Sequence, residues 1–371
     1  MKRTLGLTLL LFATLFSCMR QEKPLPAELS RAESVMWEHP DSALSILRSM
    51  PQSSLSSGKN YATWALLLAQ ARDKVYGKRL PDSLNIPSSD KLVQDAMDYF
   101  EKEGNLKRMA QTYYYKGQLL KDQKKITEAM PFFLKSKEMM TKLDEPLFTY
   151  LICQSLGNTY RYQDLYEESL VQLKDAYQYA LRSGNGERIS YALSELGRTY
   201  VHKNEMDSAL FYFGKSLDNA QRLGNIELEA MAMGELGVVY NKLSQGEKAL
   251  HYTRKELDLC LQISSLHKLP QVYYKIGSAF WSLGQLDSAK VYFQKSLETD
   301  NLYTLNEAYE VLYYICVEQK LYKEAIEYNN QYLIYSDSLQ VINHAGELAE
   351  IQARYDHESC LLYTSPSPRD M

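Results

Sequence analysis

Apolar residues recur along most of the chain at intervals of three and four positions, the spacing that places them on one face of an α-helix. Short polar turns containing Asn, Asp or Gly interrupt this spacing, as residues 203–207 do. Gly and Pro are few, at 17 and 11 in 371 residues, which favours long regular elements over loops. With 45% hydrophobic residues, the chain can also bury a large core. The pattern predicts an all-α protein.

The helical pattern repeats with a period of 40 residues. The period is marked by glycines at five positions: Gly117, Gly157, Gly197, Gly237 and Gly277. A Leu or Ile precedes each of the last four glycines, and a Tyr or Phe follows each of these four three positions later. A small residue stands twelve positions after every glycine: Ala129, Ser169, Ala209, Ala249 and Ala289. Repetition this regular indicates a stack of similar helical units.

Glycines inside helices need a physical reason, because each one costs about 1 kcal/mol relative to alanine. Close approach of two helices supplies that reason. We expect each of the five glycines to form a notch that receives a small or aromatic side chain of the next helix. Gly184 and Gly224, each followed by Asn, fit left-handed C-terminal caps, where glycine carries no steric penalty.

These residues resemble the tetratricopeptide repeat, in which a Leu-Gly pair is followed by a Tyr three residues on and an Ala twelve on. An aromatic residue four positions beyond the Ala completes the resemblance at Phe133, Phe213 and Phe293, but the chain departs from it at Leu173 and Thr253. The usual repeat has about 34 residues, so each unit here has helices longer by about a turn. The resemblance implies an α-solenoid of antiparallel helix pairs, about eight in number.

The domain organisation follows from this repeat. Residues 106–303 are predicted to form five tetratricopeptide-like repeats of 40 residues, and residues 304–336 a last divergent repeat. Residues 25–105 are predicted to form divergent N-terminal helix pairs, since terminal repeats must cap the stack. A further helix is expected over 337–358, where apolar residues at intervals of three and four suit a docking helix or the start of a coiled coil.

In similar repeats the first helix of each pair lines a concave groove. The resemblance implies groove residues at fixed places around each glycine: Tyr114, Gln118, Gln154, Asn158, Arg161, Tyr162, Ser194, Arg198, His202, Asn241, Lys242, Tyr274 and Trp281. Such a polar and aromatic strip suits an extended peptide, although single members can also be merely solvated. Replacing Arg161 and Arg198 with Glu is therefore expected to abolish ligand capture without changing stability.

The first residues have the order of an export signal. Lys2 and Arg3 precede an apolar run over 5–16, followed by small Ser17 and then Cys18. We interpret 1–17 as a signal peptide, since the run is shorter than the about 20 residues that span a bilayer. Residues 15–18 resemble a bacterial lipobox, which implies a diacylglycerol anchor on Cys18 and a tether over 18–24. An ordinary signal peptide with an incidental Cys is the alternative. The lipobox predicts a lipoprotein of the cell envelope, on its periplasmic or outer face.

The last residues, 359–371, resemble the translation of a sequencing adapter, and a genuine Ser/Pro tail is the alternative. With an adapter, the biological protein continues beyond Glu358. Exported repeat proteins of Bacteroidetes-type bacteria often continue into a membrane span and a cytoplasmic output domain. The resemblance therefore offers two functions: a lipoprotein scaffold that binds a protein or peptide, or the sensory ectodomain of a transmembrane signalling or transcriptional regulator.

Charge and candidate chemistry narrow the function further. The net charge of −4 offers no basic surplus for phosphates, so no nucleic-acid partner is expected. Cys153, Cys260 and Cys316 are spread over distant helices and are predicted to be buried free thiols, with no metal site. No catalytic motif occurs, so neither an enzyme nor a cofactor is expected, and an enzyme acting on glycans is the least favoured class. The sequence leaves the oligomeric state open.

Overall fold

The structure, a computed structural model, describes residues 25–76 and 89–340, and in these ranges it contains helices and their connections and no strand. The chain forms two units, Met1–Gly104 and Asn105–Met371. The expected signal peptide 1–17, Cys18, the tether 18–24 and the adapter-like tail 359–371 all lie outside the described residues.

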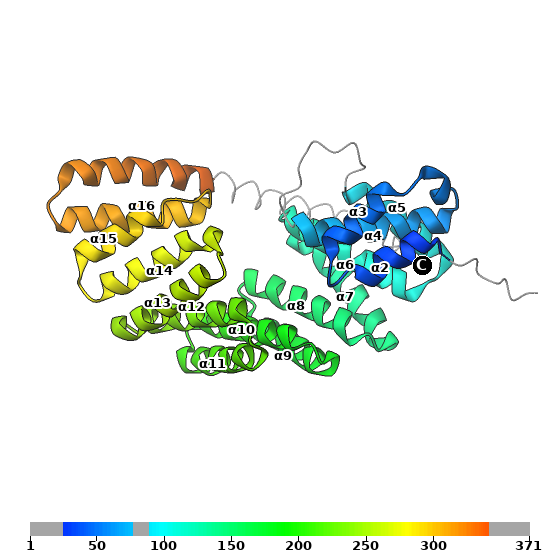
Figure 1. Cartoon of the computed structure of the whole chain (residues 1–371), viewed down its shortest axis with the longest axis horizontal. Coiled ribbons are helices and arrows are strands. Elements are labelled where there is room, and N and C mark those ends of the chain that lie inside the picture. Colours follow the sequence, from blue (N-terminus) through cyan, green and yellow to red (C-terminus); the bar gives the residue numbers. More distant parts are fainter. Residues whose placement is uncertain (1–24, 77–88, 341–371) are drawn as a thin grey trace, which may run out of the picture. The chain divides into compact units, whose positions relative to one another are not determined.

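The first unit consists of two helix pairs (Figure 1). Its elements are α2 (Ala27–Val35), α3 (Pro40–Ser49), the short 3-10 helix η1 (Gln52–Leu55), α4 (Gly58–Tyr76) and α5 (Ser89–Glu103). Each helix packs against the next, and the indole N–H of Trp64 in α4 donates to the carbonyl of Leu47 in α3 at 2.9 Å. Leu29, Leu66 and Phe100 are fully buried in the core.

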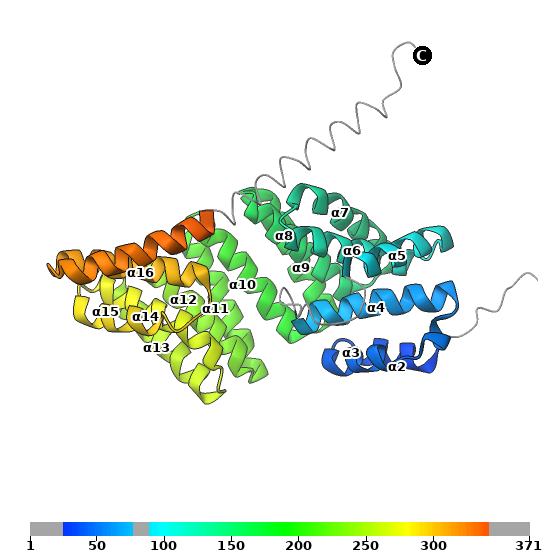
Figure 2. The ribbon, with the colours of Figure 1, turned by 90° about the horizontal axis from the view of Figure 1, so that it is seen from above.

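The second unit is a succession of helical hairpins (Figure 2). The first helices of the hairpins, called A helices, are α6 (Leu106–Asp122), α8 (Pro146–Tyr162), α10 (Gly186–His202), α12 (Ile226–Lys242), α14 (Leu269–Ser282) and α16 (Leu302–Glu318). Their partners, the B helices, are α7 (Ile126–Leu143), α9 (Tyr166–Ser183), α11 (Met206–Leu223), α13 (Gly246–Gln262), α15 (Leu286–Lys295) and the helix over 322–340. A 3-10 helix, η2 (Leu266–Lys268), precedes α14.

The helix expected over 337–358 does not begin where the sequence suggested. Residues 337–340 continue the helix that starts at 322, so the second helix of the last hairpin runs through the expected boundary. The apolar spacing is continuous across this point, and no Gly or Pro interrupts it. The remainder of the expected helix lies outside the described residues.

The turns keep the 40-residue period of the glycines as far as Gly284, and the last turn with a positive φ, at Lys320, comes 36 residues later. In the turns from A to B helices, one residue has a positive φ: Lys124, Asp164, Asn204, Ser244, Gly284 and Lys320. In the turns that precede α6, α8, α10, α12 and α14, the positive-φ residues are Gly104, Asp144, Gly184, Gly224 and Ser264. Asn follows each of these three glycines and caps the next helix; the side chain of Asn185, for example, accepts from the N–H of Arg188. The Gly-Asn pairs thus end one helix and start the next.

The five period-marking glycines occupy matching places in successive A helices. A Cβ at Gly117, Gly197 or Gly237 would stand within 2.5–2.7 Å of Phe133, Phe213 or Thr253, the side chain sixteen residues on in the paired B helix. Gly157 meets Leu173 in the same way, at 2.5 Å, whereas a Cβ at Gly277 would stand 3.1 Å from Phe293, a looser contact. Each notch therefore lets the two helices of a hairpin approach closely around a buried side chain.

The A helices form the inner side of the stack. Each A helix of the series α6, α8, α10, α12, α14 and α16 has Cα atoms within 8 Å of the next A helix. The B helices α7, α9, α11, α13 and α15 show no such backbone approach to one another. Because the hairpins lie closer together on the A side, the stack curves toward that side. We call the surface formed by the A helices the inner face.

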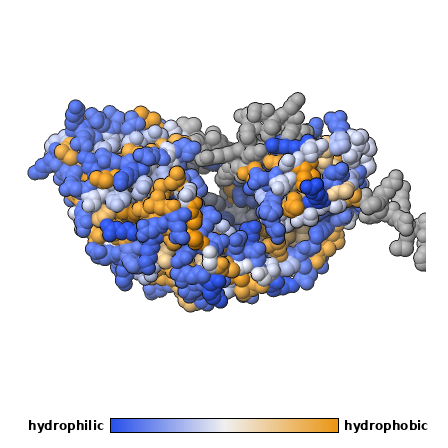
Figure 3. All heavy atoms as spheres, in the orientation of Figure 1, coloured by the Kyte–Doolittle hydropathy of each residue, from blue (hydrophilic) through white to orange (hydrophobic). Residues whose placement is uncertain are grey.

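Hydrophilic residues cover much of the surface seen in Figure 3, and hydrophobic residues are interspersed among them. Within the described ranges, no helix combines the length and the apolar character needed to cross a membrane.

Candidate functional site

Several of the residues that the sequence assigned to a groove are not available to a ligand, and Tyr114 is the first of them. Tyr114 is 5% exposed and packs edge to face against Tyr115 and Phe148, with Phe133 also beside it. Tyr114 stands three residues before Gly117, and a side chain at this position faces the following hairpin. The assignment of Tyr114 to the ligand-facing strip is therefore wrong, because the aromatic ring fills the core between two hairpins.

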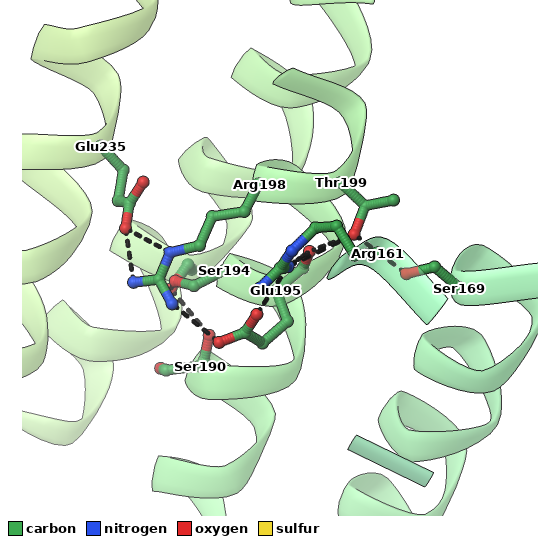
Figure 4. Close-up of polar contacts among 9 residues, drawn as sticks. Arg161, Ser169, Ser190, Ser194, Glu195, Arg198, Thr199 and Glu235 are labelled. Carbon is green, nitrogen blue, oxygen red and sulfur yellow. Dashed lines mark hydrogen bonds and ion pairs between the residues drawn. The ribbon is translucent and has the colours of Figure 1, made fainter. Parts of the chain in front are cut away.

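A ladder of charged side chains links three hairpins along the inner face (Figure 4). Arg161 of α8 donates to Oε2 of Glu195 in α10 at 2.7 Å. The other oxygen of Glu195 accepts from Arg198 at 2.7 Å, and Arg198 also donates through Nε to Glu235 of α12 at 2.7 Å. We call Arg161, Glu195, Arg198 and Glu235 the charge ladder. It is an inter-hairpin connection.

The charge ladder is largely withdrawn from water. The side chains of Arg161 and Glu195 are only 12% and 10% exposed. Burial by itself would lower the pKa of Arg198, but the carboxylates of Glu235 and Glu195 raise it above its usual value. These arginines are thus held by the protein's own carboxylates and are not free cations for a ligand.

This arrangement overturns the expectation that replacing Arg161 and Arg198 with Glu leaves stability unchanged. Such a change would put two more carboxylates against Glu195 and Glu235 in a site with little access to water. Carboxylates that lie close together repel strongly when they are poorly solvated. The two arginines therefore belong to the structural connection between hairpins.

Ser194, another expected groove residue, is fully buried and also structural. Its hydroxyl lies 3.0 Å from that of Ser216 in α11, and Ser216 donates to the carbonyl oxygen of Ser190. Asn219 adds hydrogen bonds to the Ser190 hydroxyl and to the carbonyl oxygen of Gly186. This cluster joins the helices of the third repeat.

Two asparagines of the expected strip have unused hydrogen-bonding atoms. Oδ1 of Asn158 in α8 and Oδ1 of Asn241 in α12 are buried and have no hydrogen-bond partner. Both residues are only partly buried as a whole. A buried polar atom without a partner costs free energy. These two side chains are therefore the members of the strip best suited to bond a ligand.

The remaining members of the expected strip differ in exposure. Gln118 accepts from Lys121, Gln154 is half-buried, and Lys242 is exposed. Tyr162 is 72% exposed and Trp281 is 39% exposed. His202 stacks on Tyr166 of α9, and burial with nearby Arg161 lowers its pKa. Tyr274 packs edge to face on Phe293, and burial raises its pKa. The two exposed aromatic rings are open to contact with a ligand, whereas Tyr274 is open only in part.

A pocket that the sequence did not predict opens between α10, α12, α13 and α14. Its volume is about 320 Å³. Its ionisable lining residues are Arg198, Tyr191, Glu227, Glu235, Glu256, Cys260, Lys268 and Lys275. Ligand sites commonly begin at about 300 Å³ and combine apolar walls with a few polar groups. We call this hollow the Glu256 pocket.

Glu256 of α13 is the unusual group in this pocket. It is 6% exposed, and Oε1 accepts from Lys275 of α14 at 2.7 Å, whereas Oε2 has no hydrogen-bond partner. Burial raises the pKa of this carboxyl group, and Lys275 opposes that shift. The carboxyl group lies over Gly234 of α12, where a Cβ would stand 2.5 Å from Oε2. Gly234 therefore makes the room that the buried carboxyl group needs.

A signal in the repeat could have revealed Glu256. The position nineteen residues after the period-marking glycine is otherwise small: Ser136, Ala176, Ser216 and Ser296. Only the fourth repeat has an ionisable residue there. In the same repeat the position three before the glycine is Gly234, where the others have Tyr, Gln or Ser. Glu256 and Gly234 both depart from the residues that the other repeats have at these positions. Because both lie in the fourth repeat, they mark a place where this repeat differs from the others.

The thiols have the role that the sequence predicts. Cys153, Cys260 and Cys316 are free and buried. Burial raises the pKa of Cys153 to about 12, so this thiol is held in its neutral form. Over the described ranges, no cluster of three or more His, Cys, Asp or Glu side chains is placed to hold a metal ion.

Comparisons with known proteins agree with the fold. The family model of the tetratricopeptide repeat matches residues 110–139 and 270–301, which lie in the first and the fifth repeats. No curated protein matches the sequence.

Solved structures share the architecture at low sequence identity. The first is a Signal Transduction ATPase with Numerous Domains (STAND) protein with a tetratricopeptide repeat sensor from Pyrococcus horikoshii, with a TM-score of 0.64 and 14% identity. That match covers 87% of this chain and 48% of the Pyrococcus protein, so this chain spans about half its length.

Two further similar structures match over nearly their whole length. Aspartyl phosphate phosphatase F from Bacillus subtilis has a TM-score of 0.53 at 16% identity, over 88% of this chain and 93% of its own. A Rap protein complexed with Competence and Sporulation Factor has a TM-score of 0.59 at 11% identity, over 84% and 98%. At these identities the likeness establishes the fold alone: an all-α solenoid of tetratricopeptide-like hairpins.

Proposed function

We propose that this chain is a scaffold that binds a peptide or an extended segment of another protein along its inner face. The observation that carries the proposal is the pair of unused side-chain oxygens of Asn158 in α8 and Asn241 in α12, two A helices of that face that are separated by α10. Peptide N–H groups are natural donors to such oxygens, and exposed aromatic rings such as Trp281 can cover peptide side chains. One of the similar structures is itself a complex with a factor, which is in keeping with this proposal.

A displayed library of random peptides, selected on the purified chain, tests the scaffold. Peptides that bind the inner face should lose at least about tenfold in affinity when Asn158→Ala and Asn241→Ala are combined, since each change removes a hydrogen-bond acceptor. Val171→Ser and Phe211→Ser are matched controls, because both side chains are exposed on B helices. Those variants should bind as the unchanged protein does. Failure to select any peptide would overturn the proposal, and equal binding by the asparagine variants would move the site elsewhere.

We further propose that the scaffold is an exported lipoprotein of the cell envelope, of the Bacteroidetes type, anchored to the membrane through Cys18. The support is the order of charged, apolar and small residues before Cys18. Metabolic labelling with an alkyne fatty acid should label the expressed protein, and Cys18→Ser should remove the label. Cys153→Ser is the control and should keep it, because Cys153 is a buried thiol within α8. Absence of label on the unchanged protein would favour an ordinary signal peptide.

A second candidate is the sensory part of a membrane-spanning regulator. The likeness to a protein with a tetratricopeptide repeat sensor is the observation in its favour. Sequencing the intact gene across position 358 separates the two candidates. An apolar segment of about 20 residues downstream would support the sensor, whereas a stop codon without such a segment would support the scaffold. In both candidates the chain acts by binding and not as an enzyme.

A further inference from the structure

The Glu256 pocket differs from the rest of the inner face in its balance of donors and acceptors. Every cation that lines it already has a carboxylate partner. Lys268 donates to Glu227 at 2.6 Å, Lys275 donates to Glu256 at 2.7 Å, and Arg198 donates to Glu235 at 2.7 Å. The unfilled position is therefore an acceptor, Oε2 of Glu256. An anionic ligand would find no unpaired cation here, whereas a hydrogen-bond donor would find a carboxyl oxygen.

The buried position of Glu256 strengthens this argument. A carboxylate that is 6% exposed pays a desolvation cost, and Lys275 compensates for only one of its two oxygens. The neighbouring repeats avoid that cost with a small residue at the same position, as at Ser216 and Ser296. A charged hydrogen bond to Oε2 would offset more of the desolvation free energy than a neutral one, because charged hydrogen bonds are roughly twice as strong as neutral ones.

We propose that the Glu256 pocket binds a primary ammonium group of the peptide ligand. The ammonium group donates to Oε2 of Glu256, while Lys275 keeps Oε1. The aliphatic part of the ligand lies against Leu228, Ala230 and Met231, the apolar lining of α12. This inference rests on the proposed function and adds to it the chemistry of the anchor. Both a lysine side chain and a free peptide N-terminus present such a group.

Small probes test the pocket on the intact chain without any knowledge of the natural partner. The probes are the capped tripeptides acetyl-glycyl-lysyl-glycinamide and acetyl-glycyl-norleucyl-glycinamide, together with triglycinamide, and binding is measured by calorimetry or by NMR titration. The lysyl probe should bind at least about tenfold more tightly than the norleucyl probe, which has the same stem without the ammonium group. Comparable binding of triglycinamide would identify the N-terminal amine as the anchor. Equal binding of the lysyl and norleucyl probes, or no binding of either amine, would overturn the proposal.

Three variants locate the effect. Glu256→Gln keeps the shape and removes the charge, and Glu256→Ser restores the residue that three other repeats have at this position. Both should weaken the lysyl probe at least about tenfold. Gly234→Ala should also weaken it, because the new Cβ would displace the carboxyl group. Gly214→Ala is the control, since a Cβ at Gly214 meets nothing within 4 Å. Unchanged binding by the Glu256 variants would contradict the assignment.

The outcomes separate this inference from the proposed scaffold. If library peptides bind the inner face but discriminate neither the ammonium group nor the Glu256 variants, the scaffold stands and the pocket assignment fails. If the lysyl probe binds at Glu256 while no library peptide is selected, the pocket assignment stands and the scaffold fails. Because the comparison of lysyl with norleucyl probes uses the unchanged protein, it decides the matter even if a variant does not fold.

Discussion

At the scale of single residues, glycines set how closely the helices of a hairpin approach. The same residue type has opposite effects at two places in the third repeat. A Cβ at Gly197 would stand 2.5 Å from the ring of Phe213, whereas a Cβ at Gly214 would meet nothing within 4 Å. The first glycine is required by packing, and the second only weakens its helix.

Replacing these two glycines with alanine should therefore change stability in opposite directions. Gly197→Ala should lower the free energy of unfolding by about 1–3 kcal/mol, because it overpacks a close contact. Gly214→Ala should raise it by about 0.5–1 kcal/mol through better helix propensity. Urea titrations followed by circular dichroism measure both. A Gly197→Ala variant as stable as the unchanged protein would show that the notch does not constrain the hairpin.

At the scale of the elements, the turns end helices by a backbone conformation that most residues tolerate poorly. Gly184 and Gly224 adopt positive φ at no steric cost, but Ser244 and Ser264 adopt it as well, with φ of 56° and 54°. The hydrogen bonds of the turn explain why. In the turn after α12, the N–H of Gln245 donates to the carbonyl oxygen of Tyr240, as in a helix C-terminal motif with a left-handed residue. The geometry of the hairpin imposes the conformation, whatever residue is present.

Ser244→Gly should consequently stabilise the protein. The left-handed conformation destabilises an ordinary residue by about 1–2 kcal/mol, and glycine removes this strain. The greater conformational entropy that glycine loses on folding offsets part of the gain. We expect a gain of about 0.5–1 kcal/mol in the free energy of unfolding. Lys255→Gly, at an exposed position within α13, is the matched control and should lose about 1 kcal/mol. A loss of stability in Ser244→Gly would mean that the serine side chain itself stabilises the turn.

At the scale of the molecule's second unit, the charge ladder couples hairpins that are distant in sequence. Arg161 and Glu195 are 34 residues apart, and Arg198 and Glu235 are 37 apart. Glu195 bonds both arginines, so it holds α8 and α10 together while also orienting Arg198 toward α12. A repeat protein gains stability mainly from such contacts between neighbouring hairpins.

Glu195→Gln should lower the free energy of unfolding by about 1–3 kcal/mol, a discounted value for a partly buried ion pair that loses one partner. Glu138→Gln is the control, because its pair with Lys142 is exposed and within one helix, and its effect on the urea midpoint should be negligible. A double-mutant cycle that combines Glu195→Gln with Arg161→Met measures the coupling. Additive effects of the two changes would show that the ladder contributes nothing to the junction.

Much of the architecture follows from the amino-acid sequence, whereas the arrangement of the charged side chains does not. The 40-residue spacing of Gly157, Gly197 and Gly237 determines hairpin length and phase, because local sequence controls where helices start, approach and end. The orientation of Tyr114 and the partners of Arg161 and Arg198 depend on the angle between successive hairpins. That angle is a property of stacking and not of any one helix, so an arginine expected to face a ligand faces a carboxylate of the next hairpin instead.

The sequence alone determined the helical class, the repeat, the notches and the glycine caps. Each of these depends on residues within one repeat or on the spacing between one repeat and the next. Only the tertiary structure decided which polar groups remain unpaired. Oδ1 of Asn158, Oδ1 of Asn241 and Oε2 of Glu256 are buried without a hydrogen-bond partner. Hydrogen-bond pairing across a stack depends on distances of a few ångströms between segments some 40 residues apart, and periodicity does not specify such distances.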